Sequence, residues 1–211
     1  MNSDEAIRDQ IVLATLPHVA FEGWSERALR AGAADAGWPF DELPIVFPGG
    51  AREMITHWYR YADRRMLDAL EQADTAGMST HERVAAAIRF RIEVNIPYRE
   101  AVRRTLSFLA LPHNVKLGLS STYAAVDAIW YACGDTTTDF RFYTKRATLA
   151  GVYVATILYW IDDSSEDFVE TWAFLDRRLA GASFFPRMGG RLRGMVDGLP
   201  RPFRVFGARG A

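Results

Sequence analysis

The sequence predicts an all-α fold, a bundle of eight to ten helices. Apolar residues recur at three- and four-residue steps along almost every segment, as they do on the buried face of a helix. Proline, glycine and capping residues separate these segments by short connections, and no alternating apolar run is long enough to predict a strand. At 211 residues, a single domain with one substantial core is the default.

Four helices are expected at the start of the chain, each delimited by a capping residue or a breaker. Ser3 can cap the first helix, and Pro17 is expected to end it. Ser25 can cap the second helix and Gly37 closes it, whereas Pro48 and the two glycines after it stop the third. The expected ranges are 3–17, 25–36, 41–47 and 51–76.

The rest of the chain is predicted to hold the more apolar helices. Ser79 or Thr80 can cap the first of them, which reaches Asn95 before Pro97. The uncharged run 147–161 is shorter than the ~20 residues that span a bilayer, so it is expected to be the buried central helix of the core. The expected ranges are 79–95, 98–111, 116–133, 139–161 and 165–182.

The net charge, the cysteine count and the N-terminal residues of the chain bear on its compartment and its partners. The formal net charge is -1 and the sequence pI is about 6.4, which gives no electrostatic basis for binding nucleic acid. Cys133 is the only cysteine, so an internal disulfide is impossible and a reducing compartment is expected. The N-terminal residues MNSDEAIRDQ have the pattern of neither a secretory signal nor a transit peptide, so we expect a cytoplasmic protein.

The sequence holds none of the common catalytic or metal-binding motifs. His18, His57, His81 and His113 form no HExxH motif, no Glu-x-x-His pair and no cluster with cysteine at metal-ligand spacing. No GxSxG, Walker A or GxGxxG motif is present, and Cys133 is expected to be a small core residue rather than a nucleophile. We therefore expect a binding protein without catalytic residues, metal or cofactor. An uncharacterised helical enzyme is the alternative, which metal analysis would test.

The first three expected helices could form a helix-turn-helix, because a turn that contains Gly37 joins the second to the third. The third helix reads DELPIVF, with two acidic residues, one proline and neither arginine nor lysine. These acidic side chains would repel phosphates. A helix-turn-helix scaffold that does not read DNA is therefore favoured over a DNA-binding one.

The stretch 111–143 combines aromatic residues with a Pro-His-Asn corner, a composition typical of a docking surface. Trp130 and Tyr131 are neighbours on one expected helix and point about 100° apart. One of the two is therefore expected in the core and the other at the surface, where it would be a contact for a partner. The residues that can share a face with Trp130 are Leu119, Tyr123 and Val126.

Within the run 147–161, Gly151 lies among alanines and makes a strip of small residues beside aromatic ones. A glycine inside a helix costs about 1 kcal/mol relative to alanine, so its presence needs a reason. Close helix packing and an apolar ligand pocket are the two explanations, and packing is the commoner one.

The segment 184–211 is basic, with six arginines against Asp197 alone, and six glycines and three prolines interrupt it. Its apolar residues still follow three- and four-residue steps, which is typical of a segment that rests on an anionic membrane surface. A solvated basic terminus is the alternative. The residues expected to touch the membrane are Phe184, Phe185, Arg187, Arg191 and Leu192.

Three motifs carry a resemblance to a known family: LPHN at 111–114, DAIWYACGD at 127–135 and TDFRFYTKRATLAGVY at 138–153. Over most of residues 7–180 the sequence resembles the coenzyme Q biosynthesis protein nine family, accessory lipid-binding proteins of ubiquinone synthesis. Further matching segments lie at 16–37, 47–51, 63–66 and 162–178.

The resemblance implies a TetR-like all-α fold, usually a homodimer, whose N-terminal helix-turn-helix no longer reads DNA. It also implies a non-enzymatic role, in which the protein binds an isoprenoid quinone precursor and presents it to the di-iron hydroxylase that acts on demethoxyubiquinone. A TetR-type ligand-responsive regulator is the alternative. The expected segments are a degenerate helix-turn-helix unit (1–48), a lipid-binding bundle continuous with it (49–183) and the basic tail (184–211).

The resemblance also suggests a location: we expect the protein at the inner face of a membrane, or in the mitochondrial matrix if it is eukaryotic. Two sets of site residues accompany the resemblance. The lipid-binding set is chosen from the helix pattern and comprises Val126, Trp130, Gly151, Tyr153, Ile157 and Trp160. The partner-binding set is carried over by motif match, with Leu111, Pro112 and Tyr131 as the protruding contact, and comprises Leu111, Pro112, Asn114, Asp127, Trp130 and Tyr131.

Overall fold

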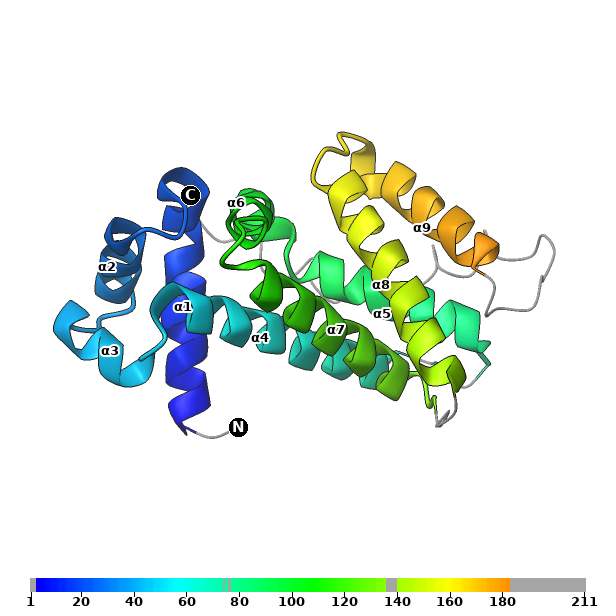
Figure 1. Ribbon diagram of the computed structural model, residues 1–211, viewed down its shortest axis with the longest axis horizontal. Helices are drawn as coiled ribbons and strands as arrows, with labels where there is room; N and C mark the ends of the chain where they lie inside the picture. Colours follow the sequence, from blue (N-terminus) through cyan, green and yellow to red (C-terminus); the bar gives the residue numbers. More distant parts are fainter. Residues whose placement is uncertain (1–2, 74, 76, 136–139, 183–211) are drawn as a thin grey trace. The chain divides into compact units, whose positions relative to one another are not determined.

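All the secondary structure in the described part of the chain is helical, which confirms the predicted all-α class (Figure 1). The computed structural model describes residues 3–73, 75, 77–135 and 140–182. Its α-helices are α1 (Ser3–Glu22), α2 (Glu26–Asp35), α3 (Leu43–Val46), α4 (Gly50–Gln72), α5 (Thr80–Glu93), α6 (Arg99–Leu109), α7 (Val115–Ala132), α8 (Phe140–Trp160) and α9 (Val169–Gly181). The short 3₁₀ helices are η1 (Phe40–Glu42), η2 (Ile96–Tyr98) and η3 (Glu166–Phe168).

Residue contacts divide the chain into two compact units. Unit 1 comprises residues 1–62 and 95–122, and unit 2 comprises residues 63–94 and 123–211. α4 and α7 each contribute residues to both units. The segments 1–48, 49–183 and 184–211 that the sequence suggests stay a prediction.

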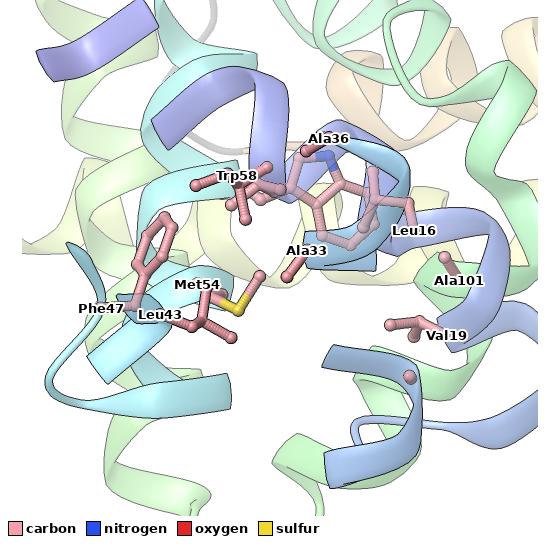
Figure 2. Close-up of a cluster of buried hydrophobic side chains, with 12 residues drawn as sticks. Leu16, Val19, Ala33, Ala36, Leu43, Phe47, Met54, Trp58 and Ala101 are labelled. Carbon is pink, nitrogen blue, oxygen red and sulfur yellow. The ribbon is translucent and has the colours of Figure 1, made fainter. Parts of the chain in front are cut away.

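Unit 1 is built around α1, which packs against α2 and α6. Figure 2 shows its core, in which side chains from α1, α2, α3, α4 and α6 meet. Gly32 of α2 lies close against α1, because a Cβ at this position would lie 2.5 Å from the Cα of Thr15. The buried core residues drawn and labelled there are Leu16, Val19, Ala33, Ala36, Leu43, Phe47, Met54, Trp58 and Ala101.

α1 does not end at Pro17, where the sequence predicts its end, but continues to Glu22. A proline inside a helix removes a backbone hydrogen bond and costs about 3 kcal/mol. Leu16 and Val19 are both fully buried in the core of unit 1. Burying such side chains contributes about 1.5–3 kcal/mol each, so packing of the last turns of α1 offsets the cost of Pro17.

In unit 2, α9 packs against α5 and α8. α5 begins at a capping box: the Ser79 hydroxyl accepts from the Glu82 amide, and the Glu82 carboxylate accepts from the Ser79 amide at 2.7 Å. Every residue of α5 from Val84 to Glu93 is buried. The run 147–161, by contrast, lies in α8 and leaves Gly151 and Leu158 exposed. The prediction that this run is the buried central helix is therefore wrong, and α5 has that place in unit 2.

The buried part of α5 carries charged side chains that pair inside unit 2. Arg89 donates to Glu93 at 3.0 Å, one helical turn away. Arg91 donates to Asp63 at 2.7 Å and to the hydroxyl of Tyr153 on α8. Both guanidinium groups are at most 5% exposed, so these partners supply the interactions that water would otherwise make.

Candidate functional site

Tyr131 is 79% exposed at the end of α7, whereas its neighbour Trp130 is 1% exposed. The prediction that one of these two aromatics lies in the core and the other at the surface is thus confirmed. The backbone beneath Tyr131 is fixed, because the amides of Gly134 and Asp135 donate to the carbonyls of Tyr131 and Trp130 at 3.0 and 3.1 Å. Gly134 has a φ of +76°, the left-handed conformation that ends helices in this manner.

Charged pairs brace this end of α7 against the start of α8. The Arg146 guanidinium donates to Asp127 at 2.7 Å, and Lys145 donates to Asp135 at 2.8 Å. The Lys145 ammonium also lies 5.3 Å from the centre of the Trp130 ring, within cation–π range. We call Tyr131 together with these bracing pairs the Tyr131 shoulder. It presents an apolar ring on a backbone that is held from two helices.

The Leu111–Asn114 corner lies in unit 1, between α6 and α7. Asn114 is fully buried, and its side-chain amide donates to the carbonyl of Phe108 at 3.0 Å, while its backbone amide donates to that of Leu111 at 2.8 Å. These hydrogen bonds close the turn. Leu111, which is 43% exposed, and Pro112, which is also exposed, lie on the surface of the turn. Asn114 therefore shapes the corner rather than facing solvent.

The structure separates the predicted partner-binding set into two kinds of residue. Leu111, Pro112 and Tyr131 are exposed and able to touch another protein, whereas Asn114 and Trp130 are buried and hold the exposed ones in place. The half-buried Asp127 belongs with the second kind, since it accepts from Arg146. Sequence reasoning missed two further exposed apolar residues on α7, Leu119 and Tyr123, at 68% and 47%. The sequence pattern predicts that these two residues share a face with Trp130 and Val126, but Trp130 and Val126 are buried whereas Leu119 and Tyr123 are not. The signal in the sequence that points to them is the run of apolar residues at four-residue steps, Leu111, Val115, Leu119 and Tyr123.

The predicted lipid-binding set lies in unit 2, and most of it is buried. α7 contributes two of its members and α8 contributes three buried ones at four- and three-residue steps. The Tyr153 hydroxyl accepts from Arg91, so this interior has a polar group beside its aromatic ones. The buried members are Val126, Trp130, Tyr153, Ile157 and Trp160, none more than 9% exposed.

Gly151 does not join that set. It lies on the exposed face of α8, and a Cβ built on it would meet no atom within 4 Å. Ala147, four residues earlier, is exposed as well. The expectation that Gly151 lines the apolar interior is therefore not met, because the small-residue strip of α8 faces outward while Tyr153 and Trp160 face inward.

Unit 2 also contains a pocket that sequence reasoning did not find, which we call the α8–α9 pocket. It lies where α8 ends and α9 begins, and its cavity volume is about 650 Å³. Its walls combine apolar side chains with acidic ones and hydroxyl groups. The signal available in the sequence is the acidic loop DDSSED at 162–167, which follows an apolar helix directly. The lining residues used below are Leu158, Tyr159, Asp162, Asp163, Glu170 and Phe174.

Asp163 fixes the first turn of α9 beneath this pocket. Its carboxylate accepts from the Thr171 amide and hydroxyl at 2.9 and 2.6 Å and from the Ser165 amide at 2.8 Å. Burial raises the pKa of Asp163, but the hydrogen bonds from Thr171 and Ser165 outweigh it and hold the pKa below the ordinary value. The group is therefore a carboxylate at neutral pH.

The predicted helix-turn-helix region is present in unit 1, and its third helix is divided into η1 and α3. Asp41, Glu42 and Ile45 are exposed there, Ile45 by 80%. This surface is acidic and apolar, which agrees with the interpretation that it does not bind phosphate groups.

The predicted membrane-contact residues Phe184, Phe185, Arg187, Arg191 and Leu192 lie outside the described residues, as does the rest of the tail. Among the helices that are described, none has the length and hydropathy needed to cross a bilayer. The described residues also contain no group of three or more His, Cys, Asp and Glu side chains that could hold a metal ion.

Comparison with known proteins identifies relatives along most of the chain. Residues 115–185 match the model of the COQ9 family. The chain is 35% identical over 187 residues to the mitochondrial ubiquinone biosynthesis protein COQ9 of Rattus norvegicus, covering 85% of this chain and 60% of that protein. The chain is 34% identical to COQ9 of Homo sapiens, and the match covers 85% of this chain and 58% of the human protein. It is 30% identical to COQ9 of Drosophila melanogaster, and the match covers 94% of this chain and 62% of the fly protein. The chain thus spans about 60% of the length of the curated relatives it matches.

A solved structure shares the fold. The TetR transcriptional regulator of Nitrosomonas europaea superimposes with a TM-score of 0.68 over 85% of this chain and 99% of that protein, at 24% sequence identity. The predicted TetR-like architecture is therefore confirmed. At this identity the likeness concerns the fold and not what either protein binds.

Proposed function

We propose that this chain, which is similar to the COQ9 proteins over most of its length, has a role in ubiquinone biosynthesis. In this role it is a non-enzymatic accessory protein that binds an isoprenoid quinone precursor and presents it to the demethoxyubiquinone hydroxylase. The single observation that carries the proposal is the Tyr131 shoulder. A ring that is 79% exposed on a braced backbone has the character of an interface anchor. Leu111 and Pro112 would add apolar contact from their own corner.

The proposed lipid step rests on the interior of unit 2. A polyisoprenoid chain is almost insoluble in water, and burying each CH₂ contributes about 0.8 kcal/mol whether the surroundings are lipid or protein. Transfer from membrane to protein is therefore close to neutral, and the carrier would lower the barrier to extraction rather than bind tightly. The buried aromatic residues Trp130, Tyr153 and Trp160 would supply apolar surface for this step.

Two further parts of the proposal concern assembly and place. We propose that the protein is a homodimer that works at the surface of a membrane, in the mitochondrial matrix or in a bacterial cytoplasm. The basic segment 184–211 would make the membrane contact, because arginines are attracted to anionic headgroups while phenylalanine and leucine enter the headgroup boundary.

Replacing Tyr131 with alanine tests the docking surface. Because the side chain is exposed, we expect Tyr131→Ala to change the free energy of unfolding by no more than about 0.5 kcal/mol. Loss of an interface anchor costs about 2 kcal/mol or more, so the affinity for purified hydroxylase, measured by calorimetry, should fall about 30-fold.

Phe21→Ala is the matched control, because Phe21 is 85% exposed on α1 in unit 1. Equal affinity of the hydroxylase for both variants and the unmodified protein would refute the docking role of Tyr131. Native mass spectrometry of the same preparations tests the remaining parts. A dimer that releases prenyl lipid on extraction supports them, and a lipid-free monomer from lipid-rich cells contradicts them.

A further inference from the structure

The α8–α9 pocket has acidic and apolar walls at once. Asp162, Asp163 and Glu170 contribute carboxylates, and Leu158 and Phe174 contribute apolar surface. No arginine or lysine is among the described residues that line it. Such a wall suits an arginine side chain, because the guanidinium group is a planar cation that both pairs with carboxylates and stacks on aromatic rings.

An aromatic stack at this pocket already holds a guanidinium group. The rings of Tyr159 and Phe174 lie parallel within 13° at 4.6 Å, and the Tyr159 hydroxyl donates to Glu170 at 3.0 Å. The guanidinium carbon of Arg178 lies 4.9 Å from the centre of the Phe174 ring. The stack and its carboxylate therefore offer the two kinds of contact that a second arginine needs.

The loop between α8 and α9, which supplies Asp162 and Asp163 to the pocket, is held in one conformation where it joins α9. Asp167 and Phe168, next to the acidic loop, have φ values of 54° and 57°, in the left-handed region that non-glycine residues enter only at a cost. The indole of Trp172 donates to the Asp167 carbonyl at 2.9 Å, and the Phe168 ring packs edge-on against Trp160. These contacts fix the end of the loop that carries the acidic residues, which lowers the cost of ordering that loop around a ligand.

The chain itself supplies a segment of complementary charge and sufficient length. Segment 184–211 has six arginines against one acidic residue and begins three residues after Gly181, the last residue of α9. From Gly181, at the end of α9, back to Glu170 is a distance of about 17 Å at the 1.5 Å rise of a helix. An extended chain covers that distance in about six residues, and Arg191 and Arg193 lie ten and twelve residues after Gly181.

We propose that the α8–α9 pocket is a binding site for arginine side chains, occupied by the basic segment 184–211 of the same chain through Arg191 or Arg193. The pocket and an anionic membrane then compete for the same arginines, so the segment reaches the membrane only when it leaves the pocket. The binding site does not depend on the lipid-carrying role, and it can be tested without lipid or hydroxylase.

Limited trypsin digestion of the full chain tests this proposal, because trypsin must take the arginine side chain into its own active site. In the double variant Asp162→Asn/Glu170→Gln, we expect cleavage after Arg191 and Arg193 to be about fivefold faster than in the unmodified protein, since two exposed ion pairs are lost. Mass spectrometry of the early fragments gives the rate at each arginine.

The double variant Asp68→Asn/Glu71→Gln is the control, because it removes the same charge from exposed positions of α4 outside the pocket. Circular dichroism verifies that all three proteins are folded. Should a double variant fail to fold, high salt applied to the unmodified protein replaces it and should also speed the cleavage. Equal rates in all proteins at every salt concentration would overturn the proposal. Protection that disappears on dilution would overturn the assignment to the same chain, and would indicate the tail of a second copy.

Discussion

Gly32 and Gly151 are both helical glycines, and the structure predicts opposite effects when each is replaced with alanine. At Gly32 the new Cβ would clash with the Thr15 hydroxyl oxygen and would lie 2.5 Å from the Cα of Thr15. Ordinary carbon contacts are about 3.5–4.0 Å, so α1 and α2 must separate. Because the clash includes the backbone of Thr15, we expect a cost in the upper part of the range for overpacking, about 2–3 kcal/mol, of which the higher helix propensity of alanine returns about 1 kcal/mol.

At Gly151 the new Cβ meets no atom within 4 Å, so only the gain in helix propensity remains. We therefore expect Gly32→Ala to lower the melting temperature by roughly 2–8 °C and Gly151→Ala to raise it by roughly 2–4 °C. Thermal unfolding followed by circular dichroism measures both. If Gly32→Ala melts at the same temperature as the unmodified protein, α1 and α2 are not in tight contact at this position. If Gly151→Ala melts at a much lower temperature, another part of the protein covers this face of α8.

Two further predictions concern buried charges in unit 2. Arg91→Met leaves Asp63 without its guanidinium partner and should lower the free energy of unfolding by about 3–5 kcal/mol, whereas adding Asp63→Leu should restore most of it, as measured by urea denaturation. Asp163→Asn removes an acceptor for Thr171 and Ser165 and should cost about 1–3 kcal/mol at neutral pH. Because the pKa of Asp163 is lowered in the folded state, its stabilisation is present above the unfolded pKa and is lost as pH falls through the folded one. The difference between this variant and the unmodified protein should therefore shrink in acid, and a constant difference would contradict the assigned hydrogen bonds.

Features that depend on local spacing could be predicted from the sequence. Ser79 caps a helix because its hydroxyl and the Glu82 carboxylate are three residues apart, and this relation is visible in the sequence. The division of Trp130 and Tyr131 between core and surface follows from the 100° turn between neighbours on a helix. The Gly134 that ends α7 is equally a local signal.

Features that depend on tertiary packing could not be predicted in this way. Pro17 usually marks the end of a helix, and only the burial of Leu16 and Val19 against other helices keeps α1 intact beyond it. Gly151 and Gly32 are also indistinguishable by propensity, since both lie among alanines in amphipathic segments. What separates them is whether another helix lies against them, and Thr15 is 17 residues away from Gly32 in the chain.

The identity of the central helix of unit 2 shows why hydropathy alone misleads in this chain. A hydropathy pattern assigns each side chain a value as if it were alone, so Arg89 and Arg91 make α5 look like a surface helix. In the fold, Arg91 meets Asp63 from α4 and Tyr153 from α8, at sequence separations of 28 and 62 residues. Each partner lowers the cost of burying the guanidinium group, and no local window of sequence contains them. The same reasoning applies to the α8–α9 pocket, whose Tyr159–Glu170 pair joins two helices across the acidic loop and exists only once α9 packs against α8.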